Sequence, residues 1–157
     1  MPKPLWAPWR LEYVQHADEL DRCIFCDPEP ELQVAHGEYA TVVLNKFPYS
    51  SGHLLVAPRR HLSDFGELAE HEVLEIHRFA ANAVEDLRAE YGAHGFNIGW
   101  NLGRAAGAGI EDHVHLHVVP RWNGDTSFMP VLGDVKVLPE HLLETARRLR
   151  ALASGRG

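Results

Sequence analysis

Residues 113–117 read His-Val-His-Leu-His, so three histidines alternate with apolar residues in one short segment. Successive side chains of a strand point to opposite sides, and His113, His115 and His117 would therefore share one face. Val114 and Leu116 would pack into a core on the other face. Imidazoles gathered in this way can bind a metal ion, attack an electrophile or transfer protons. We take this segment as the candidate reaction centre.

Three interpretations of the histidines remain open from the residues themselves. A strand whose histidines are simply hydrogen-bonded explains one such residue better than three. A metal-dependent hydrolase usually adds carboxylate ligands, yet none follows His117 before Asp125. The third interpretation is nucleophilic attack on phosphorus, and a glycine-rich stretch at 103–109 favours it. Its backbone amides could face an anion directly before the histidines.

Composition excludes several classes of protein. The chain has 157 residues, which suits one domain, and its formal net charge of −7 argues against a nucleic-acid partner. Its two cysteines offer no disulfide framework of a secreted protein. We find neither a signal peptide nor an apolar stretch long enough for a membrane span. We therefore expect a cytoplasmic protein without a membrane partner.

The elements that must position the histidines follow from periodicity. Short strands are predicted at 32–35, 39–44, 53–58, 96–100 and 113–120, and a long helix is predicted at 68–91, ended by Gly92. Its apolar stripe includes Val73, Ile76 or His77, Ala80, Val84, Leu87 and Tyr91, whereas Glu70, Glu72, Glu75, Glu85, Asp86 and Glu90 mostly take the other face. A C-terminal helix starts near Pro139. Without a regular βαβ alternation, the order favours an α+β fold with an antiparallel sheet.

Several motifs together resemble one known family. They are Trp6-Ala-Pro-Trp9-Arg10, Cys23-Ile-Phe-Cys26, the residues 44–53, 96–101 and 120–130, and His-Val-His-Leu-His-Val-Val at 113–119. The chain resembles the histidine triad (HIT) superfamily, in the bacterial branch related to fragile histidine triad and diadenosine tetraphosphate phosphorylase proteins. The resemblance implies one HIT domain over 1–157 with an N-terminal extension at 1–30. It also implies a five-stranded antiparallel sheet, one long central helix, a C-terminal helix and a homodimer.

The resemblance assigns chemistry to two histidines. His115 corresponds to the nucleophile, which would attack the α-phosphorus of a nucleotide and form a covalent nucleotidyl-histidine. His117 would bind the phosphate oxygens or hold the ring of His115. A backbone carbonyl that accepts from the second nitrogen of His115 would leave the attacking nitrogen free.

The resemblance also places Asn45 and His53 at the ribose and base, and Asn101 at the phosphate. The amides of Gly107 and Gly109 are candidates for an oxyanion site. Trp122 could stack on a base, or pack in the core or a dimer interface. The family pattern has Gly-Gln-Ser or Gly-Gln-Thr before the first histidine. This chain lacks those side chains, so substrate preference does not carry over directly.

Cys23-x-x-Cys26 is half of a zinc site. Two reduced thiols are the plain alternative, and a redox pair is disfavoured because no βαβ unit surrounds it. Resemblance to zinc-bearing relatives offers His61 and His113 as the remaining ligands. His113 would then be a structural ligand and would take no part in the reaction. We expect structural zinc and no organic cofactor.

The sequence therefore predicts a nucleotidyl hydrolase or transferase that cleaves a dinucleoside polyphosphate, by water or by phosphate. A nucleoside phosphoramidate hydrolase would use the same nucleophile on a P–N bond. A nucleotide-binding or sensing protein with little turnover is the rival from another class, and a metal-dependent hydrolase ranks last.

Overall fold

The computed structural model describes residues 22–125 and 140–156. Within these residues lie the strands β1 (Gln33–His36), β2 (Ala40–Leu44), β3 (Leu54–Pro58), β4 (Gly95–Trp100) and β5 (Leu116–Arg121), the helices α2 (Glu70–Tyr91) and α4 (Leu142–Ser154), and the 3₁₀ turns η1 (Phe65–Glu67) and η2 (Arg104–Ala106). The Trp6 and Trp9 motif, most of the extension at 1–30, Pro139 and residues 126–130 lie outside the described residues.

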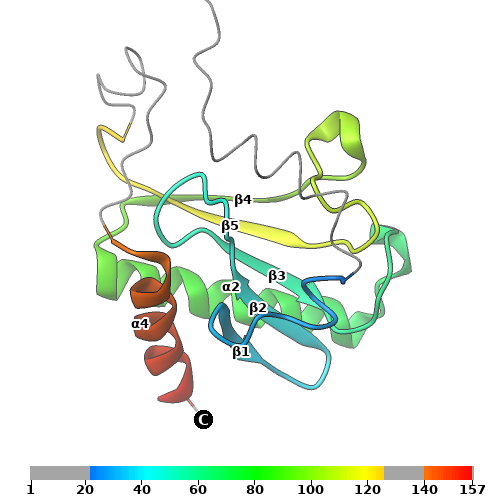
Figure 1. The fold of residues 1–157 in the computed structure, drawn as a ribbon, viewed down its shortest axis with the longest axis horizontal. Helices are drawn as coiled ribbons and strands as arrows, with labels where there is room; N and C mark the ends of the chain where they lie inside the picture. The colour runs from blue at the N-terminus through cyan, green and yellow to red at the C-terminus, as the bar shows by residue number, and fades with distance from the viewer. Residues whose placement is uncertain (1–21, 126–139, 157) are drawn as a thin grey trace, which may run out of the picture.

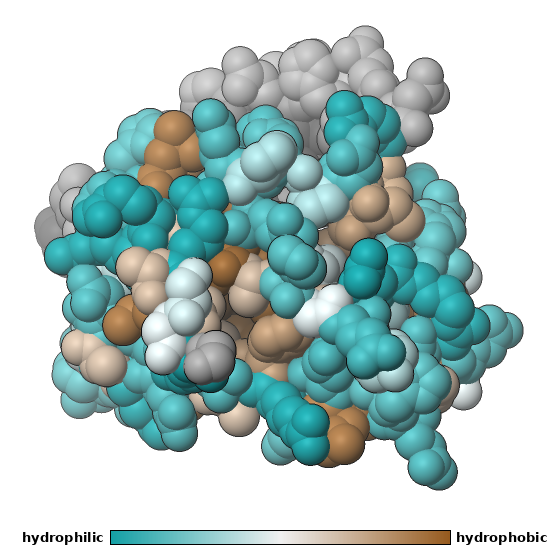
Figure 2. Space-filling model, turned by 90° about the horizontal axis from the view of Figure 1, so that it is seen from below, coloured by the Kyte–Doolittle hydropathy of each residue, from teal (hydrophilic) through white to brown (hydrophobic). Residues whose placement is uncertain are grey.

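One antiparallel sheet has the strand order β1-β2-β3-β5-β4. The long helix α2 runs along one face of this sheet, and α4 packs beside β1 and α2 (Figure 1). The predicted α+β class, with five antiparallel strands, a long central helix and a C-terminal helix, is confirmed. On the side seen in Figure 2 the surface is mostly hydrophilic, and its hydrophobic patches are small and separate.

The register of the strands separates the core from the site. Val42, Val56 and Leu116 lie in one row across β2, β3 and β5. Their row faces the helices, because Val42 lines a narrow crevice together with Phe79 of α2 and with α4. The next row, which contains His117, points to the opposite face. The sheet therefore presents His117 on the face that α2 leaves uncovered.

The predicted strand at 113–120 begins three residues too early. In the structure β5 starts at Leu116, and its pairing with β3 ends at Val56 opposite Leu116. Pro58, at the end of β3, has no amide hydrogen with which to continue the ladder. The chain before β5 is instead held by a hydrogen bond from the Val114 amide to the carbonyl oxygen of Leu62, at 2.8 Å.

The predicted apolar stripe of the long helix is partly wrong. Val73 is 50% exposed, whereas Glu72 and Asp86 are buried. Arg60 binds the Glu72 carboxylate with two hydrogen bonds, and Arg156 binds Asp86 in the same way. Because each buried carboxylate has an arginine partner, its burial costs less free energy than its hydropathy implies.

The two ends of the long helix match the prediction more closely. The helix begins at Glu70, two residues later than predicted, with the Ala69 amide donating to Glu72 at 2.8 Å. It ends at Gly92, whose left-handed backbone (φ 59°) suits glycine, as predicted. Within the part of the chain that the structure describes, no helix combines the length and apolar character that a bilayer crossing requires.

A tight approach at Gly52 fixes the start of β3. Gly52 has a φ of +80°, and a Cβ built there would lie 2.6 Å from Cδ2 of Leu87, which is fully buried in α2. Glycine is thus required twice, for its backbone angle and for its lack of a side chain. The next residue is His53, so this contact also positions the site.

Gly52→Ala should destabilise the fold by roughly 2–4 kcal/mol, because backbone strain and overpacking add. Urea unfolding of the variant measures this loss. Gly95→Ala is the matched control, since an added Cβ there meets nothing within 4 Å. Equal stability of the two variants would show that Leu87 moves aside without cost.

Candidate active site and metal cluster

His115 lies directly before β5 and is 5% exposed. Its Nδ1 is 2.8 Å from the backbone carbonyl oxygen of His113. A carbonyl oxygen only accepts, so Nδ1 carries the hydrogen and donates it. Burial lowers the pKa of His115, which keeps the ring neutral. Nε2 of His115 therefore holds an available lone pair.

A chain of hydrogen bonds fixes the ring of His53, the residue before β3. The Asn45 side-chain oxygen accepts from the Phe47 amide at 3.0 Å, so its nitrogen faces His53 Nδ1 at 3.3 Å. The Tyr49 amide also donates to His53 Nδ1, at 3.1 Å. With Nδ1 accepting, the hydrogen of His53 sits on Nε2, 3.0 Å from Nδ1 of His117.

His117 thereby receives a defined tautomer. Its Nδ1 accepts from His53, so the hydrogen of the neutral ring is on Nε2. Burial, with a smaller contribution from His115, lowers the pKa of His117 to about 4. Nε2 of His117 lies 3.5 Å from the side-chain nitrogen of Asn101. The structure thus brings together Asn45, His53, Asn101, His115 and His117, five of the predicted site residues.

The glycine-rich loop uses several of its own amides internally. The amides of Ala106 and Ala108 donate to the Gly103 carbonyl, and that of Gly107 donates to the Arg104 carbonyl. The Gly107 amide, which was predicted to contact an anion, therefore already donates its hydrogen within the loop. The loop still borders the site, because a Cβ on Gly107 would lie 3.9 Å from Asn101 Nδ2.

Trp122 serves the core in this structure. Its indole nitrogen donates to the carbonyl oxygen of Tyr91 at 2.9 Å, and its ring packs against the core cluster. It follows His117 by five residues, or about 16 Å of extended chain. Of the roles considered for Trp122, core packing is the one that these contacts display.

Cys23, Cys26, His61 and His113 form a compact group whose potential ligand atoms all lie within 4.8 Å of one another. Nδ1 of His113 is 3.1 Å from Sγ of Cys23 and 3.2 Å from Nδ1 of His61, and Sγ of Cys26 is 3.3 Å from the latter atom. Tetrahedral coordination with bonds of about 2.0–2.3 Å places neighbouring ligand atoms about 3.3–3.8 Å apart. The four residues could hold one metal ion.

The second ring nitrogen of His113 supports the same arrangement. Nε2 lies 2.7 Å from the carbonyl oxygen of Pro58, to which it donates its hydrogen. Nδ1 is thereby left without a hydrogen and faces the cysteines. Metal-ligating histidines commonly donate from their other nitrogen in this manner. The donor set of two sulfurs and two imidazoles fits zinc.

Two aromatic residues without an assigned role from the sequence also contact the histidines. Phe25 is 2% exposed, and its ring centroid lies 5.1 Å from that of His113 and 4.9 Å from that of His115. Tyr49 stacks on His53 at 5.0 Å and is 45% exposed. An apolar residue inside Cys-x-x-Cys was the available signal for Phe25.

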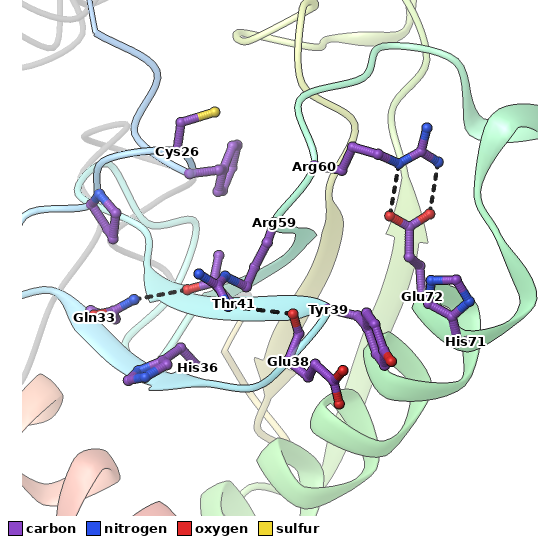
Figure 3. A pocket seen from close by; sticks show the side chains of 12 residues that line it. Cys26, Gln33, His36, Glu38, Tyr39, Thr41, Arg59, Arg60, His71 and Glu72 are labelled. Atoms are coloured by element: carbon purple, nitrogen blue, oxygen red, sulfur yellow. Dashed lines mark hydrogen bonds and ion pairs between the residues drawn. The ribbon is translucent and has the colours of Figure 1, made fainter.

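A separate open cavity of about 570 Å³ lies beside this region. Figure 3 shows it between the β1–β2 hairpin, the residues after β3 and the start of α2, with Arg60 paired to Glu72. Phe25 and Cys26 form part of its wall, whereas none of His115, His117 and Asn101 lines it. Phe25 is thus shared between the cavity and the surroundings of His115.

Comparison with known proteins agrees with this geometry. The model of the HIT domain matches residues 28–124. A Mycobacterium tuberculosis protein named AP-4-A phosphorylase is 37% identical over 92% of this chain and 81% of its own length. An uncharacterised HIT-like protein of Methanocaldococcus jannaschii is 35% identical over 73% of this chain and 89% of its own.

One solved structure has a similar fold. It is a Zn-bound histidine triad family protein from Mycobacterium smegmatis, 31% identical, with a TM-score of 0.69, covering 85% of this chain and 94% of that one. The resemblance drawn from the sequence motifs is thereby confirmed. The chain belongs to the HIT domain family, the histidine triad family of nucleotide hydrolases and transferases.

Proposed function

We propose that this protein cleaves a dinucleoside polyphosphate of the diadenosine tetraphosphate type by two successive transfers through His115. The observation that carries the proposal is the hydrogen bond from His115 Nδ1 to the His113 carbonyl oxygen, at 2.8 Å. It leaves Nε2 as a neutral nucleophile whose direction is fixed. The name of the Mycobacterium tuberculosis relative supports this substrate class.

In the first step, the lone pair on His115 Nε2 forms a bond to the α-phosphorus of the substrate. The bridging P–O bond breaks, and its electron pair leaves with the distal polyphosphate. The hydrogen on Nδ1 stays in place, so the modified ring carries a positive charge. The His113 carbonyl then accepts a charge-assisted hydrogen bond, which is stronger than a neutral one.

His117 would donate from Nε2 to the oxygens of the reacting phosphate, because its Nδ1 is occupied by His53. Asn101 lies beside that nitrogen and would contribute a second polar group to the phosphate. Asn45 and His53 form the side of the site that would take the nucleoside. Donors held in place before the reaction need no reorganisation when charge develops on the phosphate.

In the second step, phosphate or water attacks the nucleotidyl-histidine. An oxygen of the acceptor forms a bond to phosphorus and its proton passes to solvent, while the N–P bond breaks and its electron pair returns to Nε2 of His115. Orientation of a bound acceptor can lower a barrier by up to about 7–11 kcal/mol in the best models, which outweighs the abundance of water. We propose phosphate as the acceptor, held close to His117 and Asn101. We assign Arg104 no part in holding this phosphate, since its side chain is 86% exposed and paired with Glu111.

We propose that Cys23, Cys26, His61 and His113 hold structural zinc. Four ligands complete a tetrahedral site and leave no position for substrate, so the ion would supply stability rather than Lewis-acid chemistry. We also propose a homodimer, as the family resemblance implies. Edge strand β4, which pairs only with β5 within the described residues, offers free backbone groups for such an association.

His115→Asn should reduce turnover of diadenosine tetraphosphate by at least about 10³-fold while nucleotide binding stays within about threefold. Acid quenching of the unmodified protein should trap one nucleotide per chain, and the variant should trap none. His77→Asn, an exposed histidine of α2, is the matched control. Wild-type turnover in His115→Asn excludes the mechanism, and tight binding without any turnover in the unmodified protein favours a sensor.

His61→Ala should abolish zinc binding and lower the temperature of unfolding, because binding of structural zinc contributes to folding free energy. The unmodified protein should contain about one zinc per chain by elemental analysis. His71→Ala, an exposed histidine of α2, should keep its zinc. Equal metal content in both variants contradicts the assignment of His61 as a ligand.

Labelled phosphate should enter ADP when the protein cleaves diadenosine tetraphosphate, giving ADP and ATP as products. The label should reside in the β-phosphate of ADP, since phosphate displaces the adenylyl group from His115. Chromatography of the products at several phosphate concentrations provides the measurement. If AMP and ATP form at every phosphate level and ADP stays unlabelled, the protein is a hydrolase.

A further inference from the structure

Phe25 contacts both His113 of the proposed zinc site and His115, the proposed nucleophile. It is 2% exposed, between two cysteines of which Cys26 is exposed and Cys23 partly buried. Its ring centroid lies 4.9 Å from that of His115, with an angle of 32° between the rings. Within the segment 23–26, Phe25 is the residue that is buried against the histidines.

The ring of His115 has a second aromatic neighbour. The His117 ring centroid lies 4.9 Å away at an angle of 52°. Because burial lowers the pKa of His117 to about 4, that neighbour is neutral and does not repel a charge on His115. Phe25 and His117 together restrict rotation of the His115 ring, whose edge is held by the His113 carbonyl.

A buried cation at this position needs stabilisation. Once Nε2 of His115 is bonded to phosphorus, Nε2 no longer holds a lone pair and Nδ1 keeps its hydrogen, so the ring is positive. The face of an aromatic ring carries partial negative charge and attracts a cation within about 6 Å of its centroid. The His113 carbonyl lies at the edge of the His115 ring, and Phe25 lies against its face.

We propose that Phe25 is a positioning residue for the nucleotidyl transfer: its ring holds the plane of His115, and its π face stabilises the positive charge on the nucleotidyl-His115 intermediate. This inference rests on the proposed function. It assigns to the segment between the cysteines a role in the rate of the reaction in addition to metal binding. Phe25 acts through His115 and needs no contact with the phosphate.

Fluorination of the ring at Phe25 tests the electrostatic part, because it removes negative charge from the π face with little change of shape. Phe25 is replaced by 4-fluoro-, 3,5-difluoro- and 3,4,5-trifluorophenylalanine in the full-length, zinc-loaded protein. Rapid quenching at saturating diadenosine tetraphosphate gives the rate constant for nucleotidyl-enzyme formation. We expect it to fall stepwise, by between about twofold and thirtyfold across the series.

The same series at Phe79 is the matched control, since Phe79 packs against the core from α2. We expect no trend there, and we expect equal zinc content and unfolding temperature throughout both series. Phe25→Leu, which keeps bulk and removes the π face, should resemble the most fluorinated variant in rate. In its NMR spectrum the Nδ1 hydrogen of His115 should exchange faster, because one side of the ring is less restrained.

The outcomes separate three cases. A constant rate across the Phe25 series, with nucleotidyl-enzyme still formed, overturns this inference and leaves the proposed function intact. A change confined to the dissociation constant of AMP, with the rate at saturation unchanged, shows that Phe25 contacts the nucleotide and also overturns it. Absence of any nucleotidyl-enzyme in the unmodified protein contradicts the proposed function, and the charge-stabilising role is wrong with it.

Discussion

The hydrogen bond between Nδ1 of His115 and the carbonyl oxygen of His113 is the constraint on which the site depends. It decides which nitrogen of His115 carries a hydrogen, and it spans one intervening residue, so the local backbone alone can hold it. The backbone and the side chain of His113 therefore have different functions. Its carbonyl orients the proposed nucleophile, while its side chain faces the cysteines and donates to Pro58. Movement of this residue would disturb both sites together.

Pro58 explains why one residue can face both sites. The ladder between β3 and β5 stops short of Pro58, which offers no amide hydrogen, and the segment before β5 leaves the regular sheet. The carbonyl oxygen of Pro58 remains available and accepts from His113. An ordinary strand through 113–117 would have aligned all three imidazoles in one row. The break instead sends His113 to the metal cluster and leaves His115 and His117 side by side.

The sequence allowed the elements to be predicted where local pattern decides them. The strand at Leu54–Pro58 and the end of α2 at Gly92 follow from hydropathy and from the left-handed cap of glycine. The start of β5 could not be predicted, since it depends on where β3 ends. Burial of Asp86 was equally out of reach, because its partner Arg156 is 70 residues away.

The candidate site was predicted from two kinds of signal. Spacing identified the three histidines, and resemblance added Asn45, His53 and His61, which are remote in the chain. The tautomers of His53 and His117 required three-dimensional contacts, since they depend on the Tyr49 amide. Phe25 was overlooked because an apolar residue between cysteines signals burial but does not show which ring it will contact.

The strand order protects the site from local unfolding at the β1 edge of the sheet. β5 lies between β3 and β4, so the backbone on both sides of His117 is paired, and the peripheral elements β1 and α4 lie on the far side of β2 and β3. Local opening in proteins begins where few hydrogen bonds and contacts must break, and central strands open last. Fraying of β1 or of the last turn of α4 can thus occur without displacing His117. The β1 edge of the sheet can open locally while the imidazoles of His115 and His117 keep their positions.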